Sequence, residues 1–189
     1  MQTAHEFFLH ELNDMLDAEK KLVEALEEQA EESSRPELKR GFEMHQKQTE
    51  GQVNRLQRAF QELGEEPEGT ECAGIKGLKE EHDNFKEEDP SEDLLDVFNV
   101  GAAKKIERYE ITAYESLIQL ARDMGHKEVV RLLQQNLREE QGTLKKLTAM
   151  EKKVKPERSG MEEEEERASG NRRRPQRSSG RGSRRGRAA

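Results

Sequence analysis

Apolar residues along the chain recur at steps of three and four, which is the period of one face of an α-helix. The first such stripe consists of Phe8, Leu12, Met15, Leu22 and Leu26. Thr3 precedes it, and Glu6 follows Thr3 at the spacing of a capping box. The pattern therefore predicts a first helix that ends near Ser33.

A second stripe follows almost at once. Ser34 and Glu37 repeat the capping-box spacing, and Pro36 falls in the first turn, where a missing N–H does no harm. The stripe comprises Leu38, Phe42, His45, Thr49, Leu56 and Leu63. Gly64 predicts the end of this second helix.

The second half of the chain predicts another pair of long helices, over about residues 91–124 and 127–153. Residues 64–90 form a connector rich in Gly and acidic residues, with one short helix expected around Ile75 to Phe85. Two tight hairpins joined by a long connector have the connectivity of an all-α, ferritin-like up-down four-helix bundle. The alternative, an elongated coiled coil, is disfavoured by the two short turns.

Composition supports an all-helical domain with a thin core. Of the residues, 39% are charged, 31% are hydrophobic and 4% are aromatic, which is too lean for a β-sandwich or an α/β sheet. The single cysteine, Cys72, excludes an internal disulfide framework and fits a reducing compartment. Neither a run of about 18 apolar residues nor a secretory signal is found, so we expect no membrane span and a cytoplasmic location.

Charge divides the chain into two parts. Residues 171–189 contain eight Arg and no acid, whereas the whole chain carries −8, so residues 1–170 carry −16. We expect a four-helix bundle over residues 1–155 and a disordered, acidic and then Arg/Gly/Ser-rich tail over 156–189, because such a composition cannot bury enough apolar surface to fold.

Acidic residues and one histidine lie on or beside the apolar stripes of all four long helices. They are Glu19, His45, Glu50, Glu107, Glu110, Glu139 and Glu140. Glu19 and Glu50 are 31 residues apart, and Glu107 and Glu139 are 32 apart. Two antiparallel hairpins of matched length would bring these side chains to one level halfway along the bundle.

A shared level of carboxylates predicts a metal site, because clustered carboxylates repel one another unless a cation neutralises them. Oxygen ligands with one imidazole suit Fe or Mn. The alternative is chance: Asp and Glu make up 41 of 189 residues, so an acid on an apolar stripe is common. Glu107 and Glu110 would then pair on the surface with Lys104 or Arg108, and His45 would be an ordinary bundle residue.

Five segments resemble the YciE/YciF family of ferritin-like stress proteins. They are LDAEKKLVEAL (16–26), HQKQTEGQVNRL (45–56), CAGIKGL (72–78), KIERYEITAYESL (105–117) and LREEQGTLKKL (137–147). The resemblance covers about residues 3–152. It implies a bundle that is often dimeric, with a dinuclear metal site, and it implies no particular activity. The candidate ligands carried over are Glu19, Glu50, Glu107, Glu110 and either Glu139 or Glu140, with His45 as a further one; the Glu-x-x-His pair of catalytic ferritin-like proteins is absent.

Two functions follow, and the sequence leaves open whether the protein is an enzyme. The first is a stress-associated Fe or Mn protein that oxidises Fe(II) or removes peroxide. The second is a metal-free helical interaction protein whose tail contacts nucleic acid or an acidic partner. The tail arginines that would neutralise phosphates are Arg172, Arg173, Arg174, Arg177, Arg181, Arg184, Arg185 and Arg187.

Overall fold

Five α-helices make up most of residues 1–156, which are the residues that the computed structural model describes. The helices are α1 (Ala4–Glu32), α2 (Pro36–Leu63), α3 (Ala73–Glu87), α4 (Glu92–Asp123) and α5 (Lys127–Glu151). Their bounds lie within a few residues of those predicted from the hydrophobic pattern, and the predicted all-helical fold is confirmed. The tail and its arginines lie outside the described residues.

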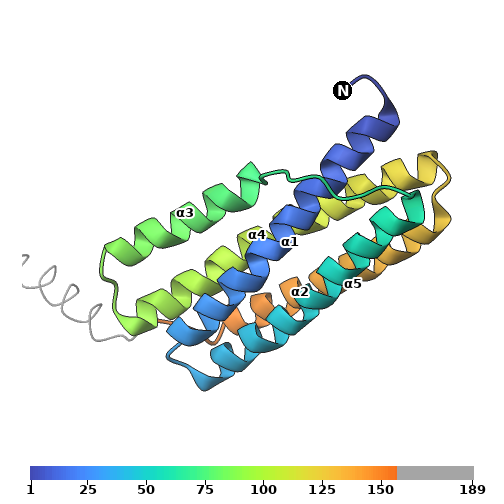
Figure 1. Cartoon of the computed structure of the whole chain (residues 1–189). Helices are drawn as coiled ribbons and strands as arrows, with labels where there is room; N and C mark the ends of the chain where they lie inside the picture. The colour runs from blue at the N-terminus through green and yellow to red at the C-terminus, as the bar shows by residue number, and fades with distance from the viewer. Residues whose placement is uncertain (157–189) are drawn as a thin grey trace, which may run out of the picture. The chain divides into compact units, whose positions relative to one another are not determined.

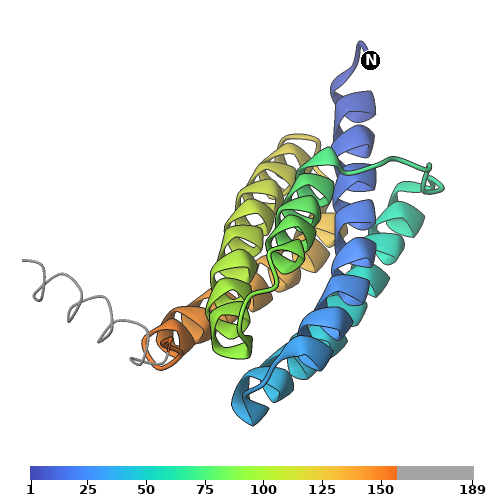
Figure 2. The ribbon, with the colours of Figure 1, turned by 90° about the vertical axis from the view of Figure 1, so that its left-hand side faces the viewer.

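The four long helices form two antiparallel hairpins, α1 with α2 and α4 with α5 (Figure 1). The connector that contains α3 returns the chain along the outside of the bundle, so α4 runs in the same direction as α2 (Figures 1 and 2). Hydrogen bonds from Ser34, in the first hairpin turn, to Asp96 near the start of α4 fix this arrangement. The observed connectivity is that of a ferritin-like bundle.

The helix ends follow from local chemistry. Thr3 and Glu6 form the predicted capping box, in which each side chain accepts a hydrogen bond from the other's backbone N–H at 3.1 Å. Gly64 and Gly125 have φ of 72° and 79°, a left-handed conformation that Gly adopts without strain. The predicted capping box of Ser34 and Glu37 was wrong, because Arg35 is the N-cap of α2 and the Ser34 hydroxyl donates to Asp96 instead.

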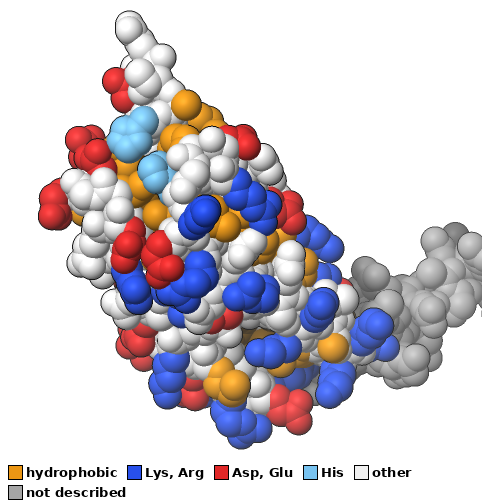
Figure 3. All heavy atoms as spheres, turned by 90° about the vertical axis from the view of Figure 1, so that its right-hand side faces the viewer, with side chains coloured by type: hydrophobic (Ala, Val, Ile, Leu, Met, Phe, Trp, Pro, Cys, Tyr) orange, Lys and Arg blue, Asp and Glu red, His pale blue; other side chains and the backbone are white. Residues whose placement is uncertain are grey.

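The bundle core contains two separate apolar clusters. One includes Phe8, Leu56 and Leu117, and the other includes Leu38, Phe42 and Leu147. Along α2 and α5, buried polar residues lie between the stretches that contribute to the two clusters, and on α4 Glu107 and Glu110 lie among the residues of the first cluster. The outer surface differs from this interior, since hydrophobic side chains on the face in Figure 3 form only small patches among charged ones. Within residues 1–156, no helix is long and apolar enough to cross a membrane.

Candidate metal centre

Five buried side chains from all four bundle helices meet in the interior of the bundle. They are Glu19 of α1, His45 of α2, Glu107 and Glu110 of α4, and Glu140 of α5. The four glutamates are at most 1% exposed and His45 is 8% exposed. Their donor atoms form two groups, His45–Glu107–Glu140 and Glu19–Glu110–Glu140, each with all atoms within 4.8 Å of one another. Glu140 belongs to both groups.

Helix periodicity explains why these side chains meet. Glu107 and Glu110 are three residues apart on α4, so they lie on one face. His45 is three residues beyond the buried Phe42 and four before the buried Thr49, so it takes a core position of α2. Glu140 lies four residues after the buried Asn136 on α5. The same stripes that bury the apolar clusters therefore bury the donors.

Several donor atoms in the centre lack hydrogen-bond partners. His45 Nε2 lies 3.2 Å from Glu107 Oε1 and 3.7 Å from Glu140 Oε2. Both oxygens of Glu107, Oε2 of Glu19, Oε2 of Glu140 and Nδ1 of His45 are buried and make no hydrogen bond. Buried polar atoms are normally paired, because leaving one unpaired costs about 1–3 kcal/mol. The centre therefore contains several oxygen and nitrogen atoms that are free to coordinate a metal ion.

Burial and mutual repulsion change the acidity of the cluster. Removal from water, followed by the charge of Glu140, raises the pKa of Glu107 to about 11. The same two causes, in the same order, raise the pKa of Glu19 and of Glu110 well above the ordinary value of a glutamate. A cation at the centre would act in the opposite direction, since an adjacent positive charge favours the carboxylate form.

A second set of buried polar residues orients the donors. Gln52 Nε2 donates to Glu140 Oε1, and the Tyr114 hydroxyl donates to Glu19 Oε1. Asn136 Nδ2 donates to the Tyr114 oxygen at 2.8 Å, and Asn136 Oδ1 accepts from Arg55 Nε. Supporting hydrogen bonds of this kind fix the orientation of metal ligands.

Gln52, Asn136 and Tyr114 were not among the site residues predicted from the sequence. A signal was present for the first two. Gln52 lies seven residues after His45 and Asn136 lies four before Glu140, so each occupies the same face as a candidate donor.

Two of the predicted site residues lie elsewhere. Glu50 is exposed, because the buried stripe of α2 passes through Thr49 and Gln52 and leaves position 50 on the solvent side. Glu139 is partly buried, and it accepts hydrogen bonds from Arg55 and from Gln135. The structure thus distinguishes the two alternatives on α5, since Glu140 joins the cluster and Glu139 forms an ion pair beside it.

The donor set fits a hard divalent cation. Four carboxylates and one imidazole are the ligand types of Fe and Mn sites. Two donor groups that share one carboxylate have the composition of a dinuclear site, in which a carboxylate bridges two ions. The sequence contains no Glu-x-x-His pair, as noted above, and the imidazole comes instead from a separate helix, α2.

Comparison with known proteins identifies the family of the chain. A family model described as a domain of unknown function (DUF892) matches residues 3–159. Protein YciF of Escherichia coli K12 is 34% identical over 149 residues, which cover 78% of this chain and 90% of YciF.

Three solved structures share the fold. The E. coli stress protein YciF has a TM-score of 0.77 at 32% identity, over 80% of this chain and 96% of that one. YcfI of Rhodopseudomonas palustris has a TM-score of 0.76 at 36% identity, over 78% and 94%. A protein of Xanthomonas campestris, at 23% identity and a TM-score of 0.63, supports the fold alone, over 80% and 93%. The chain therefore belongs to the DUF892 family and is a relative of the stress protein YciF, as the sequence resemblance predicted.

Proposed function

We propose that the bundle binds iron or manganese at a dinuclear centre formed by Glu19, His45, Glu107, Glu110 and Glu140. The observation that carries this proposal is the convergence of five buried side chains, of which four have at least one polar atom that makes no hydrogen bond. A purely structural cluster would be expected to satisfy its own donors and acceptors.

Each ligand has a role that follows from its position. Glu140 would contribute to the binding of both ions, because it belongs to both donor groups. His45 and Glu107 complete one group, and Glu19 and Glu110 complete the other. When bound, a redox-active ion pair of this kind supplies one-electron chemistry for oxidation of Fe(II) or reduction of peroxide.

The protein contributes orientation and a dry environment. Tyr114 holds Glu19 and Gln52 holds Glu140, so two ligands from different hairpins are fixed before any ion arrives. The apolar clusters exclude bulk water and strengthen each charge interaction at the centre. A low-dielectric, preorganised site is what a metal with several carboxylate ligands requires.

Metal analysis of the full chain tests the proposal. Protein loaded with Fe(II) without oxygen, or with Mn(II), should retain about two ions per chain after desalting, as dinuclear bundles do. Glu107→Gln combined with Glu110→Gln should remove this retention. Glu50→Gln is the matched control, since Glu50 is exposed and outside the cluster.

The proposal is wrong if the wild-type protein and the Glu107→Gln, Glu110→Gln variant retain equal amounts of metal. Activity is a separate question, measured as the rate of Fe(II) oxidation in air or of hydrogen peroxide loss by loaded protein. A protein that retains metal but accelerates neither reaction would keep the metal site and lose the proposed chemistry.

A further inference from the structure

A pocket of about 130 Å³ opens between α2 and α5. None of the four glutamates of the metal centre lines it, but His45 does. A much smaller cavity on the inner side, of about 10 Å³, is lined by both His45 and Glu107. The imidazole of His45 therefore lies between the α2/α5 pocket and the centre.

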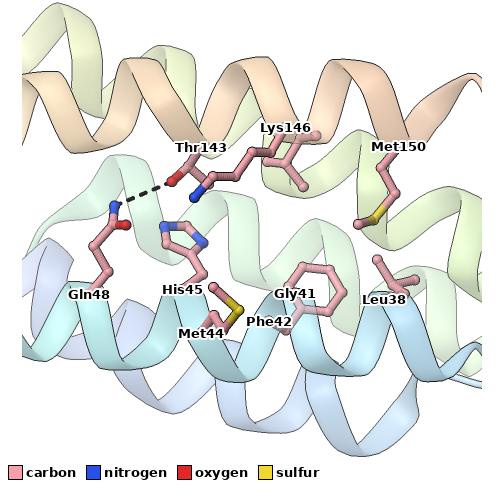
Figure 4. A pocket seen from close by; sticks show the side chains of 10 residues that line it. Leu38, Gly41, Phe42, Met44, His45, Gln48, Thr143, Lys146 and Met150 are labelled. Carbon is pink, nitrogen blue, oxygen red and sulfur yellow. Dashed lines mark hydrogen bonds between the residues drawn. The ribbon is translucent and has the colours of Figure 1, made fainter.

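The two ends of the pocket differ in chemistry, as Figure 4 shows. At one end, the labelled side chains are Leu38, Phe42 and Met150. At the other end, Gln48 and Thr143 approach each other above His45, and Gln48 Nε2 donates to Thr143 Oγ1 at 3.3 Å. A molecule that fills the pocket must therefore be apolar at one end and polar at the other.

Lys146 sets the charge that the polar end prefers. Its side chain extends from α5 along the pocket, and its ammonium group lies over His45 close to Thr143 (Figure 4). Lys146 is exposed, and its ammonium makes no ion pair or hydrogen bond with any residue between 1 and 156, although its charge acts on the buried Glu107 and lowers the pKa of that carboxyl group. A positive charge at the end of an apolar pocket is complementary to an anion.

We infer that the α2/α5 pocket binds a small amphipathic monoanion. Its carboxylate, or a similar head, lies beside Lys146, Gln48 and Thr143, and its apolar body lies against Leu38, Phe42 and Met150. A dry cavity of about 150 Å³ accommodates a benzene molecule, so this pocket suits an apolar body of about six non-hydrogen atoms. The inference deepens the proposed function and rests on it in one respect, since it assigns the class of molecule that reaches the His45 side of the metal centre.

A titration of the full, isotope-labelled chain by NMR tests the inference, with hexanoate as the probe. Hexan-1-ol and hexylamine are the neutral and cationic controls of equal chain length. Hexanoate should bind and shift the amide signal of Gly41, and it should bind more tightly than either control. The titration is performed twice, once on metal-free protein and once on protein loaded with zinc instead of manganese, because neither sample depends on catalysis.

Two variants separate charge from shape. Lys146→Gln should weaken hexanoate binding roughly three- to fivefold, as expected for a partly exposed ion pair, and should leave hexan-1-ol unchanged. Gly41→Leu should weaken hexanoate and hexan-1-ol by roughly tenfold or more, because a Cβ on Gly41 would lie 3.5 Å from Met150 Cε and its branches would fill the pocket. Gly101→Leu is the matched control, since a Cβ there meets open space.

The outcomes distinguish this inference from the proposed function. Equal binding of hexanoate and hexan-1-ol, or no effect of Lys146→Gln, overturns the assignment of an anion. Binding unaffected by Gly41→Leu, or no binding at all, overturns the pocket itself. Neither result changes metal retention by the wild-type chain. The metal centre is therefore tested separately, by the retention measurement.

Discussion

Two buried carboxyl groups on the same helix have opposite surroundings. Asp96 of α4 is fully buried, and it accepts hydrogen bonds from the Ser34 backbone at 3.1 Å, the Ser34 hydroxyl at 2.6 Å and Arg35 Nη1 at 2.8 Å. Glu107 of α4 is equally buried, and neither of its oxygens accepts a hydrogen bond. The first carboxyl group accepts three hydrogen bonds, whereas the second lies among further acids with His45 Nε2 at 3.2 Å from its Oε1.

The difference separates a structural role from a functional one. Asp96 ties the start of α4 to the turn between α1 and α2, so its burial is offset by the bonds that it makes. Glu107 and its neighbours lower the stability of the metal-free fold, because carboxyl groups that are buried without partners cost free energy. A fold selected for stability alone would place apolar residues at those positions.

Addition of metal should give the largest change in the free energy of unfolding. A ligand that binds only the folded state stabilises it by about 4 kcal/mol at a thousand times its dissociation constant. Denaturant unfolding with and without Mn(II) should show a gain of this size for the wild type and for Glu50→Gln. The gain should be lost in the Glu107→Gln, Glu110→Gln variant; a gain of equal size there would place the metal elsewhere.

Raising the pH should destabilise the metal-free protein by a similar amount. The pKa of Glu107 is about 11 in the folded state and about 4.5 in the unfolded chain, so the folded form binds the proton more tightly. Its contribution is complete below pH 4.5 and declines as the pH rises towards 11, by about 1.4 kcal/mol per pH unit.

Between pH 5.5 and 7.5, with a chelator present, the free energy of unfolding should therefore fall by about 3 kcal/mol. The measurement is a set of urea titrations at several pH values. Glu107→Gln should show a shallower slope, because one of the groups that gains a proton on folding is gone. A wild-type stability that rises with pH over this range would contradict the prediction.

Asp96→Ala should destabilise the protein by about 2–3 kcal/mol with or without metal, because Arg35 and the Ser34 hydroxyl lose their shared acceptor. Chemical unfolding measures the loss. Metal retention should stay at the wild-type level, since Asp96 is not among the donors of the centre. Loss of metal together with stability would show that the two regions are coupled.

Glu107→Met should give the smallest effect and the opposite sign. Replacing a buried acid that accepts no hydrogen bond by an apolar side chain of similar length should stabilise the metal-free protein by about 1–2 kcal/mol. The same substitution should abolish most of the stabilisation by Mn(II). A variant less stable than the wild type in chelator would mean that Glu107 has a structural role after all.

Much of the fold was predictable because helix stripes and caps are local signals. The apolar steps along residues 8–26, the capping box of Thr3 and the left-handed Gly64 depend on residues a few positions apart, and the structure agrees with each. The role of Ser34 was not predictable, since its partner Asp96 lies 62 residues away.

The position of the candidate centre along the bundle was predictable from the sequence, but the residues that form it were less so. Glu107, Glu110 and Glu19 occupy buried positions of their stripes, as the pattern indicated. Glu50 was chosen for its distance along the chain from Glu19, and that distance does not determine which way a side chain points. Rotation around a helix is 100° per residue, so one position separates the exposed Glu50 from the buried Thr49.

The sharing of Glu140 between the two donor groups also determines when, during synthesis of the chain, metal can bind. Each group needs one residue of the first hairpin and, from the last helix, Glu140. A nascent chain that has released only α1 to α4 from the ribosome therefore holds neither group complete. Metal loading at this centre would have to follow the release of α5, at the moment when this helix closes the bundle.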